Sequence, residues 1–188
     1  MSLLAPRHAV LTGAPGAGKT TLLNAAEAAG FRTSPEVARQ LLQSPGGMAL
    51  READPLEFAE AMLEAHVREF ERHATVEGLI VFDRGFPDVV GFLDVSGLPI
   101  PKAVDRACRT VRYQGPIFRA PAWAAIYAQD AERIQDWEQA VASDDAVTAA
   151  WRRYGYAVTD LPLVGVGERL EFLKSAGINS PSNGDLCG

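Results

Sequence analysis

The chain alternates between short apolar runs and longer segments in which apolar residues recur every three or four positions. The apolar runs predict strands, and the continuous ones are typical of strands buried on both faces of a parallel sheet. The predicted strands are residues 8–12, 31–33, 79–82, 116–119 and 156–160. This alternation predicts a three-layer α/β/α fold with a doubly wound, mainly parallel five-stranded sheet.

The segments between these strands carry residues that commonly begin and end helices. Ser34 and Pro35 are suited to the start of one helix, and Asp54 and Pro55 to the start of a long one. The breaker Pro45-Gly46-Gly47 predicts a loop over residues 43–53. Further helices are predicted over residues 19–29, 104–113, 130–142, 143–154 and 168–176.

A glycine-rich segment follows the first predicted strand and matches the phosphate-binding pattern G-x-x-x-x-G-K-[ST]. Its glycines permit backbone conformations in which successive N–H groups face one anion, and the next helix adds its N-terminal partial charge. We expect Lys19 to reach the β- and γ-phosphates of a nucleotide and the Thr20 hydroxyl to bind Mg²⁺. The predicted nucleotide site consists of Gly13, Ala14, Pro15, Gly16, Ala17, Gly18, Lys19, Thr20 and Thr21.

Two carboxylates follow predicted strands at the edge of the sheet where the phosphate loop lies. Asp83 comes directly after strand 79–82, the place of an aspartate that organises Mg²⁺; the alternative is an ordinary turn residue. Arg84 has a five-donor fork that suits a phosphate or carboxylate, unless it is a solvated surface arginine. Glu36 follows strand 31–33, where ligands of open α/β sheets bind, but the helix dipole also favours a carboxylate there.

Other polar and aromatic residues admit a structural and a functional interpretation. His66 borders the apolar stripe of the long helix, so a structural role is favoured over a catalytic one. Trp123 and Tyr127 are four residues apart and could pack together or against a nucleotide base. A stripe of three arginines indicates either a solvated helix face or a contact with substrate or partner: Arg106, Arg109 and Arg112.

Length and composition narrow the class of protein. The 188 residues suffice for one domain, expected over residues 1–176 and followed by a flexible tail over 177–188. The net charge of −6 argues against nucleic-acid binding, and the apolar runs are too short to span a membrane. Cys108 and Cys187 are expected to be free thiols, which agrees with a soluble cytoplasmic protein.

Five motifs in this order resemble the AAA-domain predicted ATPase/kinase family. That family is similar to the ribosylnicotinamide-kinase domain of bacterial NAD regulators and, more distantly, to deoxynucleoside and nucleoside-monophosphate kinases. The resemblance extends over about residues 7–176. The motifs lie at residues 13–21, 35–39, 83–88, 123–133 and 154–156.

The resemblance implies roles for individual residues. Glu36 matches the carboxylate that activates the acceptor hydroxyl in deoxynucleoside kinases. Asp83 and Arg84 match their Asp/Glu-Arg-Ser motif, in which Gly85 here replaces the serine. Arg133 occupies the place of the arginine that a kinase lid brings to the transferring phosphoryl group, and the lid itself is expected near residues 128–143.

Two functional hypotheses follow. The first is a kinase that uses ATP and Mg²⁺ to phosphorylate a small nucleoside- or nucleotide-like acceptor, with Thr20 and Asp83 organising the metal. The second is an ATPase or nucleotide-dependent switch that acts on a protein partner. A homodimer is left open. The catalytic residues predicted for the kinase are Lys19, Glu36, Asp83, Arg84 and Arg133.

Overall fold

The computed structural model describes residues 7–76, 78–127 and 136–176. In this part of the chain five parallel strands form one sheet in the order β2-β3-β1-β4-β5. The predicted α/β fold with a doubly wound five-stranded sheet is therefore confirmed. The strands are β1 (Arg7–Gly13), β2 (Arg32–Thr33), β3 (Leu79–Asp83), β4 (Ile117–Ala120) and β5 (Val158–Asp160).

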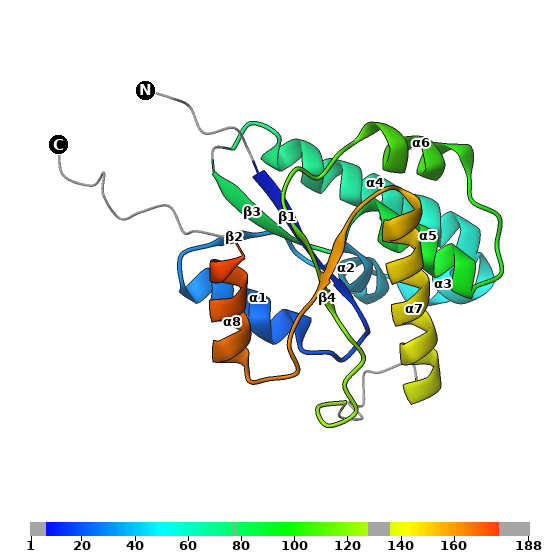
Figure 1. Ribbon diagram of the computed structural model, residues 1–188. Helices are drawn as coiled ribbons and strands as arrows, with labels where there is room; N and C mark the ends of the chain where they lie inside the picture. Colours follow the sequence, from blue (N-terminus) through cyan, green and yellow to red (C-terminus); the bar gives the residue numbers. More distant parts are fainter. Residues whose placement is uncertain (1–6, 77, 128–135, 177–188) are drawn as a thin grey trace.

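Helices cover both faces of the sheet and complete the three layers (Figure 1). One layer contains α1 and α8, and the other contains α4, α5, α6 and α7. The short helices α2 and α3 pack beside α4. The helices are α1 (Lys19–Ala28), α2 (Val37–Gln43), α3 (Gly47–Ala53), α4 (Pro55–His73), α5 (Phe86–Val95), α6 (Lys102–Thr110), α7 (Trp137–Arg153) and α8 (Val166–Ser175).

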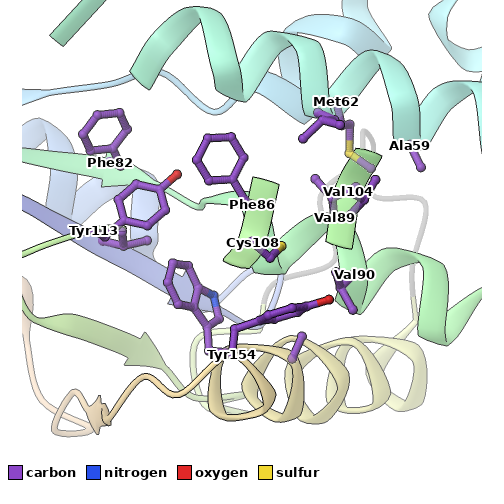
Figure 2. Close-up of a cluster of buried hydrophobic side chains, with 14 of the residues drawn as sticks. Ala59, Met62, Phe82, Phe86, Val89, Val90, Val104, Cys108, Tyr113 and Tyr154 are labelled. Atoms are coloured by element: carbon purple, nitrogen blue, oxygen red, sulfur yellow. The ribbon is translucent and has the colours of Figure 1, made fainter. Parts of the chain in front are cut away.

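Alternation along the strands explains why both faces of the sheet are covered. Leu79 and Val81 of β3 belong to the apolar core beneath α1 and α8. Ile80 and Phe82 belong to the larger core on the opposite face, where aromatic side chains gather (Figure 2). Since successive side chains of a strand point to opposite faces, a continuous apolar run needs a helical layer on each side.

The centre of the sheet is also the point where the chain changes direction. β1 lies between β3 and β4: the chain runs from β1 to β2 on one side of β1, and from β3 to β4 on the other side. Leu11 pairs with Asp83, and Gly13 pairs with Ala120, which brings the carboxyl ends of three strands together. Such a switch point leaves a crevice that open α/β sheets use for ligands.

Two helices lie where none was predicted. The expected loop over 43–53 contains α3: α2 ends at Gln43, and Gly46, with φ of 81°, is the N-cap from which α3 starts. The segment from Gly85 to Val104 carried no predicted element, yet it contains α5. Most residues of α5 are buried, so the periodic polar face that would reveal a helix is missing.

A third prediction was wrong about where a helix begins. Helices over 130–142 and 143–154 were expected, with Ser143 as the second cap, but α7 is continuous through Ser143. Its cap is Asp136, whose carboxylate accepts a hydrogen bond from the Gln139 N–H at 2.8 Å. The expected lid near 128–143 therefore includes the first turns of α7, while residues 128–135 lie outside the described residues.

Three smaller points complete the comparison. Cys108 is a buried free thiol, and Cys187 and the expected tail lie outside the described residues. The predicted apolar stripe of α4 packs into the core through Ala59, Leu63 and Phe70. Within the described ranges, every helix is too short or too polar to cross a membrane.

Candidate functional site

The loop between β1 and α1 contains the backbone conformations that a phosphate-binding loop requires. Gly13, Gly16 and Gly18 have φ values of 113°, 73° and 80°. At Gly13 the backbone of β4 is so close that any Cβ would clash with the Ala120 carbonyl oxygen. The loop leads into α1 at Lys19, so the free N–H groups of a helix N-terminus belong to the same site.

Lys19 is buried beside this loop, and within the described part of the chain its ammonium group hydrogen-bonds only to backbone carbonyl oxygen atoms. Its ammonium group donates to the carbonyl oxygen of Ala14 at 2.6 Å and to that of Gly13 at 3.3 Å. Burial, followed by the charge of Arg84, lowers the pKa of Lys19 to about 8. A buried cation with weak carbonyl partners gains from an anion, so the side chain is suited to hold a phosphate.

Arg84 joins the end of β3 to the phosphate loop and to α2. Its Nη1 donates to the Gly13 carbonyl at 3.2 Å and to Asp88 Oδ1 at 3.0 Å, and its Nε contacts Glu36 Oε1 at 3.3 Å. Its φ of 67° lies in the left-handed region, which costs a non-glycine residue about 1–2 kcal/mol. The solvated alternative for Arg84 is thereby wrong, because its side chain is 13% exposed and held in place on three sides.

Asp88, in the first turn of α5, is a site residue that was not predicted. Its Oδ1 accepts hydrogen bonds from Thr12 Oγ1 at 2.6 Å and from Arg84. Its Oδ2 accepts from the Gly85 N–H at 3.0 Å and from Trp151 Nε1 at 2.9 Å. Four donors, from β1, the turn between β3 and α5, and α7, thus fix Asp88, which in turn fixes Arg84. The sequence contains one signal for Asp88: it lies three residues after Gly85, the N-cap of α5, which is the position of the carboxylate in a capping box.

Gly85 replaces the serine of the resembling motif for a steric reason. Its backbone is extended, so no special φ is required. A Cβ at this position would lie 2.9 Å from the ring of Tyr113, which packs against Phe86 in the core. The aromatic ring therefore occupies the space that a serine side chain would need.

Asp83 differs from Asp88 because one of its oxygen atoms has no partner. The residue is 3% exposed, and its Oδ1 lacks a hydrogen bond within the described part of the chain. Its backbone N–H donates to Ser34 Oγ at 3.2 Å. Burial, and then the charge of Glu36, raises the pKa of Asp83 to about 7. A buried carboxylate with a free oxygen fits a cation or a water-bound cation as its missing partner.

Glu36 faces Arg84 from the N-cap position of α2, two residues after the cap expected at Ser34, and its side chain makes no capping hydrogen bond. Burial alone would raise the pKa of Glu36, but Arg84, Lys19 and Arg39 outweigh this effect and lower the pKa below its ordinary value. Its second oxygen lies 3.5 Å from Arg39 Nε. The carboxylate is therefore ionised at neutral pH and is held by two arginines close to the phosphate loop.

A cavity of about 1070 Å³ connects these groups. Its lining includes the phosphate loop, Trp123 and the start of α8, together with residues of α2, α3, α4 and α5. Lys19, Glu36 and Arg84 line the same cavity, so the structure brings three of the predicted catalytic residues together. Asp83, the last residue of β3, is close enough to all three for their charges to shift its pKa, and Arg133 lies outside the described residues.

Arg169 of α8 is a second residue that was not predicted, and it supports the phosphate loop. Its Nη1 donates to the Ala17 carbonyl at 2.7 Å, and its Nε donates to the Pro162 carbonyl at 2.9 Å. Its guanidinium lies 5.0 Å from the ring centre of Trp123. Nothing in the local sequence marks an arginine 150 residues away as part of the loop.

The remaining candidates are largely occupied within the protein. Arg109 pairs with Asp105 at 2.9 Å, and Arg112 donates to the Tyr154 carbonyl at 2.7 Å. Tyr127 packs against Trp137 with ring centres 5.2 Å apart. His66 is buried on the wall of the cavity, and burial lowers its pKa to about 4, so the ring is neutral.

The parallel sheet, the phosphate loop at its switch point and the carboxylate after β3 define a protein with the P-loop fold of small kinases. A family model described as AAA domain matches residues 8–169, so the chain belongs to that family. The resemblance inferred from the motifs is thereby confirmed. Among curated proteins, a search finds no match to this chain.

Solved structures agree with the fold at low sequence identity. A deoxyadenosine kinase from M. mycoides with the products dCMP and dCDP is 14% identical, with a TM-score of 0.67. The alignment covers 89% of this chain and 97% of the kinase. A NadR protein in complex with NR is 17% identical, with a TM-score of 0.66. It aligns with 91% of this chain, which spans half of NadR.

Proposed function

We propose that this protein is a kinase that transfers the γ-phosphoryl group of ATP to a hydroxyl group of a nucleoside- or nucleotide-like acceptor. The observation that carries the proposal is an unbroken line of contacts. Glu36 contacts Arg84 at 3.3 Å, and Arg84 contacts the Gly13 carbonyl of the phosphate loop at 3.2 Å. An ionised carboxylate is thus adjacent to the place where the terminal phosphate of a nucleotide would lie.

The donor end of the site consists of residues 13–21. The loop amides and Lys19 would hold the β- and γ-phosphates of ATP. Thr20 and Asp83 would hold Mg²⁺, which neutralises phosphate charge when bound, and the free oxygen of Asp83 supports this assignment. Arg169 keeps the loop in shape through its contact with Ala17.

In the proposed reaction the acceptor oxygen attacks the γ-phosphorus of ATP. The bond between this phosphorus and the β–γ bridging oxygen breaks, and ADP leaves with the electron pair. Glu36 accepts the proton of the acceptor hydroxyl, for which its ionised state is suited. Arg84 neutralises charge on the transferring group, because Asp88 holds its guanidinium against the loop. Arg133 stays a predicted lid arginine.

The comparisons support a small-molecule acceptor. Both solved relatives contain small ligands, deoxycytidine nucleotides in one and NR in the other. An ATPase or switch that acts on a protein partner has less support from the described residues. Arg109 and Arg112, two of the three arginines of the candidate partner stripe, are engaged inside the chain.

Replacement of Glu36 by glutamine tests the proposal. Transfer of labelled γ-phosphate is measured over a panel of nucleosides, nucleoside monophosphates and small alcohols, together with ADP release without acceptor. Glu36→Gln is expected to lower transfer by about 10²–10⁴-fold and to leave ATP affinity unchanged, since it removes the base and keeps the shape. Glu64→Gln, on the exposed face of α4, is the matched control.

Two results would contradict the kinase assignment. One is ATP hydrolysis that proceeds at full rate with every acceptor absent, because a kinase site excludes water as a competing acceptor. The other is phosphoryl transfer that Glu36→Gln leaves intact, because the carboxylate would then serve only the helix terminus.

A further inference from the structure

Basic side chains dominate the charge of the cavity. The described residues that line it include five basic side chains and two carboxylates. Both carboxylates already contact Arg84. The excess of positive charge stands out in a chain whose net charge is −6, and it favours anionic ligands. The basic residues are Lys19, Arg39, Arg51, Arg84 and Arg169, and the carboxylates are Glu36 and Asp88.

The basic residues form two groups. Lys19, Arg84 and Arg169 each contact a carbonyl of the phosphate loop, so they belong to the donor end. Arg39 comes from α2, beside Glu36, and Arg51 comes from the last turn of α3; among the described residues neither contacts a carbonyl of the phosphate loop. The phosphates of ATP account for the first group and leave the second group unexplained.

Arg51 has no internal partner that would account for it. Within the described ranges it makes no ion pair and no side-chain hydrogen bond, although it lines the cavity and is partly buried. Its place in the last turn of α3 suits the helix dipole, but that role is served equally well by a side chain pointing to solvent. The Arg39 side chain is 57% exposed, and its only ion pair among the described residues joins its Nε to Glu36.

The walls between these arginines are mainly apolar. Phe58 of α4 and Phe92 of α5 meet edge to face, with ring centres 5.6 Å apart. Met62 and Val89 extend from the same two helices into the space between them (Figure 2). The imidazole of His66, which burial keeps neutral, adds one polar group to this wall. Such a surface accepts an aromatic or aliphatic body and gives it few hydrogen bonds.

We propose that the acceptor is an anion with an apolar, ring-sized body, which carries a phosphate or carboxylate in addition to the hydroxyl presented to Glu36. Arg39 and Arg51 bind this anionic group, and the wall of α4 and α5 packs against the body. The inference rests on the proposed function, because it takes the part of the cavity lined by α2 and α3, next to Glu36, as the acceptor site. It distinguishes the acceptor from a neutral nucleoside, which would leave Arg51 unpaired.

Matched pairs of neutral and anionic compounds test this inference. One pair is thymidine and thymidine monophosphate, and the other is para-hydroxymethyl benzamide and para-hydroxymethyl benzoate. Binding to the ADP-loaded protein is measured by calorimetry, and transfer from ATP is measured by phosphorus NMR. We expect the anionic member of at least one pair to bind about 10- to 100-fold more tightly, the usual effect of a charged hydrogen bond. The pair that responds separates phosphate from carboxylate.

The Arg51→Gln variant tests whether Arg51 causes the preference for the anionic compound. It is expected to abolish the preference for the anionic member and to leave ADP affinity unchanged, whereas Arg106→Gln on the exposed face of α6 changes neither. Binding without charge preference, or preference that survives Arg51→Gln, overturns the inference, as does the absence of binding by every member. Transfer without charge preference supports the kinase and overturns this inference alone. Charge-dependent binding without transfer supports this inference and contradicts the kinase assignment.

Discussion

Two buried aspartates in the site face opposite electrostatic environments. Asp88 receives four hydrogen bonds, so its charge is fully compensated within the protein. Asp83 is equally buried, but one of its oxygen atoms has no donor in the described residues. A buried carboxylate without a partner does not stabilise a protein. We therefore explain Asp83 by a bound ligand that supplies the missing partner of its free oxygen atom.

At the residue scale, we expect Asp83→Asn to stabilise the ligand-free protein while it impairs activity. Burial raises the folded-state pKa of Asp83 from 3.8 to about 7, so the wild-type chain loses stability as the pH rises through this window. The variant lacks this loss. Its melting temperature should therefore equal that of the wild type near pH 4 and exceed it by a few degrees above pH 7.

Thermal unfolding in buffer without nucleotide and magnesium measures this effect. Asp145→Asn, at a 74% exposed carboxylate, is the control and should show no such pH dependence. A variant that is less stable than the wild type above pH 7 would mean that Asp83 has an internal partner after all.

At the element scale, the turn from β3 to α5 holds the arginine of the site. Arg84 adopts an unfavourable backbone conformation there, and Asp88 compensates by binding Arg84, the Gly85 N–H and two residues of other elements. The turn is therefore fixed by tertiary contacts, since the local sequence alone would favour a relaxed conformation for Arg84.

Asp88→Asn is expected to destabilise the protein by at least about 3 kcal/mol. The NH₂ group of the asparagine would face buried hydrogen-bond donors that now donate to the carboxylate of Asp88. Transfer activity should fall with it, since Arg84 loses its anchor. Denaturant unfolding and steady-state kinetics measure the two effects. Asp94→Asn provides a control in the same helix: it breaks a more exposed pair with Arg153, for which about 0–1 kcal/mol is expected. Equal losses in both variants would show that Asp88 has no special role.

At the scale of the whole molecule, the cavity concentrates positive charge in an acidic protein. Binding of phosphates at one end should stabilise the entire fold, because a ligand that binds only the native state shifts unfolding by mass action. At 100 times its dissociation constant the gain is about 2.7 kcal/mol, and each 1 kcal/mol raises the melting temperature of a chain of this length by about 2–4 °C.

We therefore expect ADP and pyrophosphate to raise the melting temperature and adenosine to have little effect. Lys19→Ala should remove most of the gain and leave the unliganded melting temperature close to that of the wild type, because Lys19 contacts only two loop carbonyls. Scanning fluorimetry with the three ligands makes the comparison. Stabilisation by adenosine equal to that by ADP would mean that the phosphate loop is not the main binding element.

The sequence by itself determined the sheet and the phosphate-binding loop, and it predicted the side chains of the proposed donor end. Strands such as 79–82 are continuous apolar runs, and the loop over 13–20 is a contiguous motif. Neighbouring residues are therefore enough to predict both. Asp83 and Glu36 could be predicted for the same reason, because Asp83 directly follows predicted strand 79–82 and Glu36 lies three residues after predicted strand 31–33.

Only the tertiary structure decided how the site is held together. Asp88 bonds to Thr12 and Trp151, which are 76 and 63 residues distant in the chain, and Arg169 reaches Ala17 across 152 residues. Such contacts leave no periodic or local signal. α5 was missed because burial on nearly all sides removes the polar face that marks a helix. Local patterns therefore predicted most of the candidate site residues, while long-range packing fixed the geometry in which they meet.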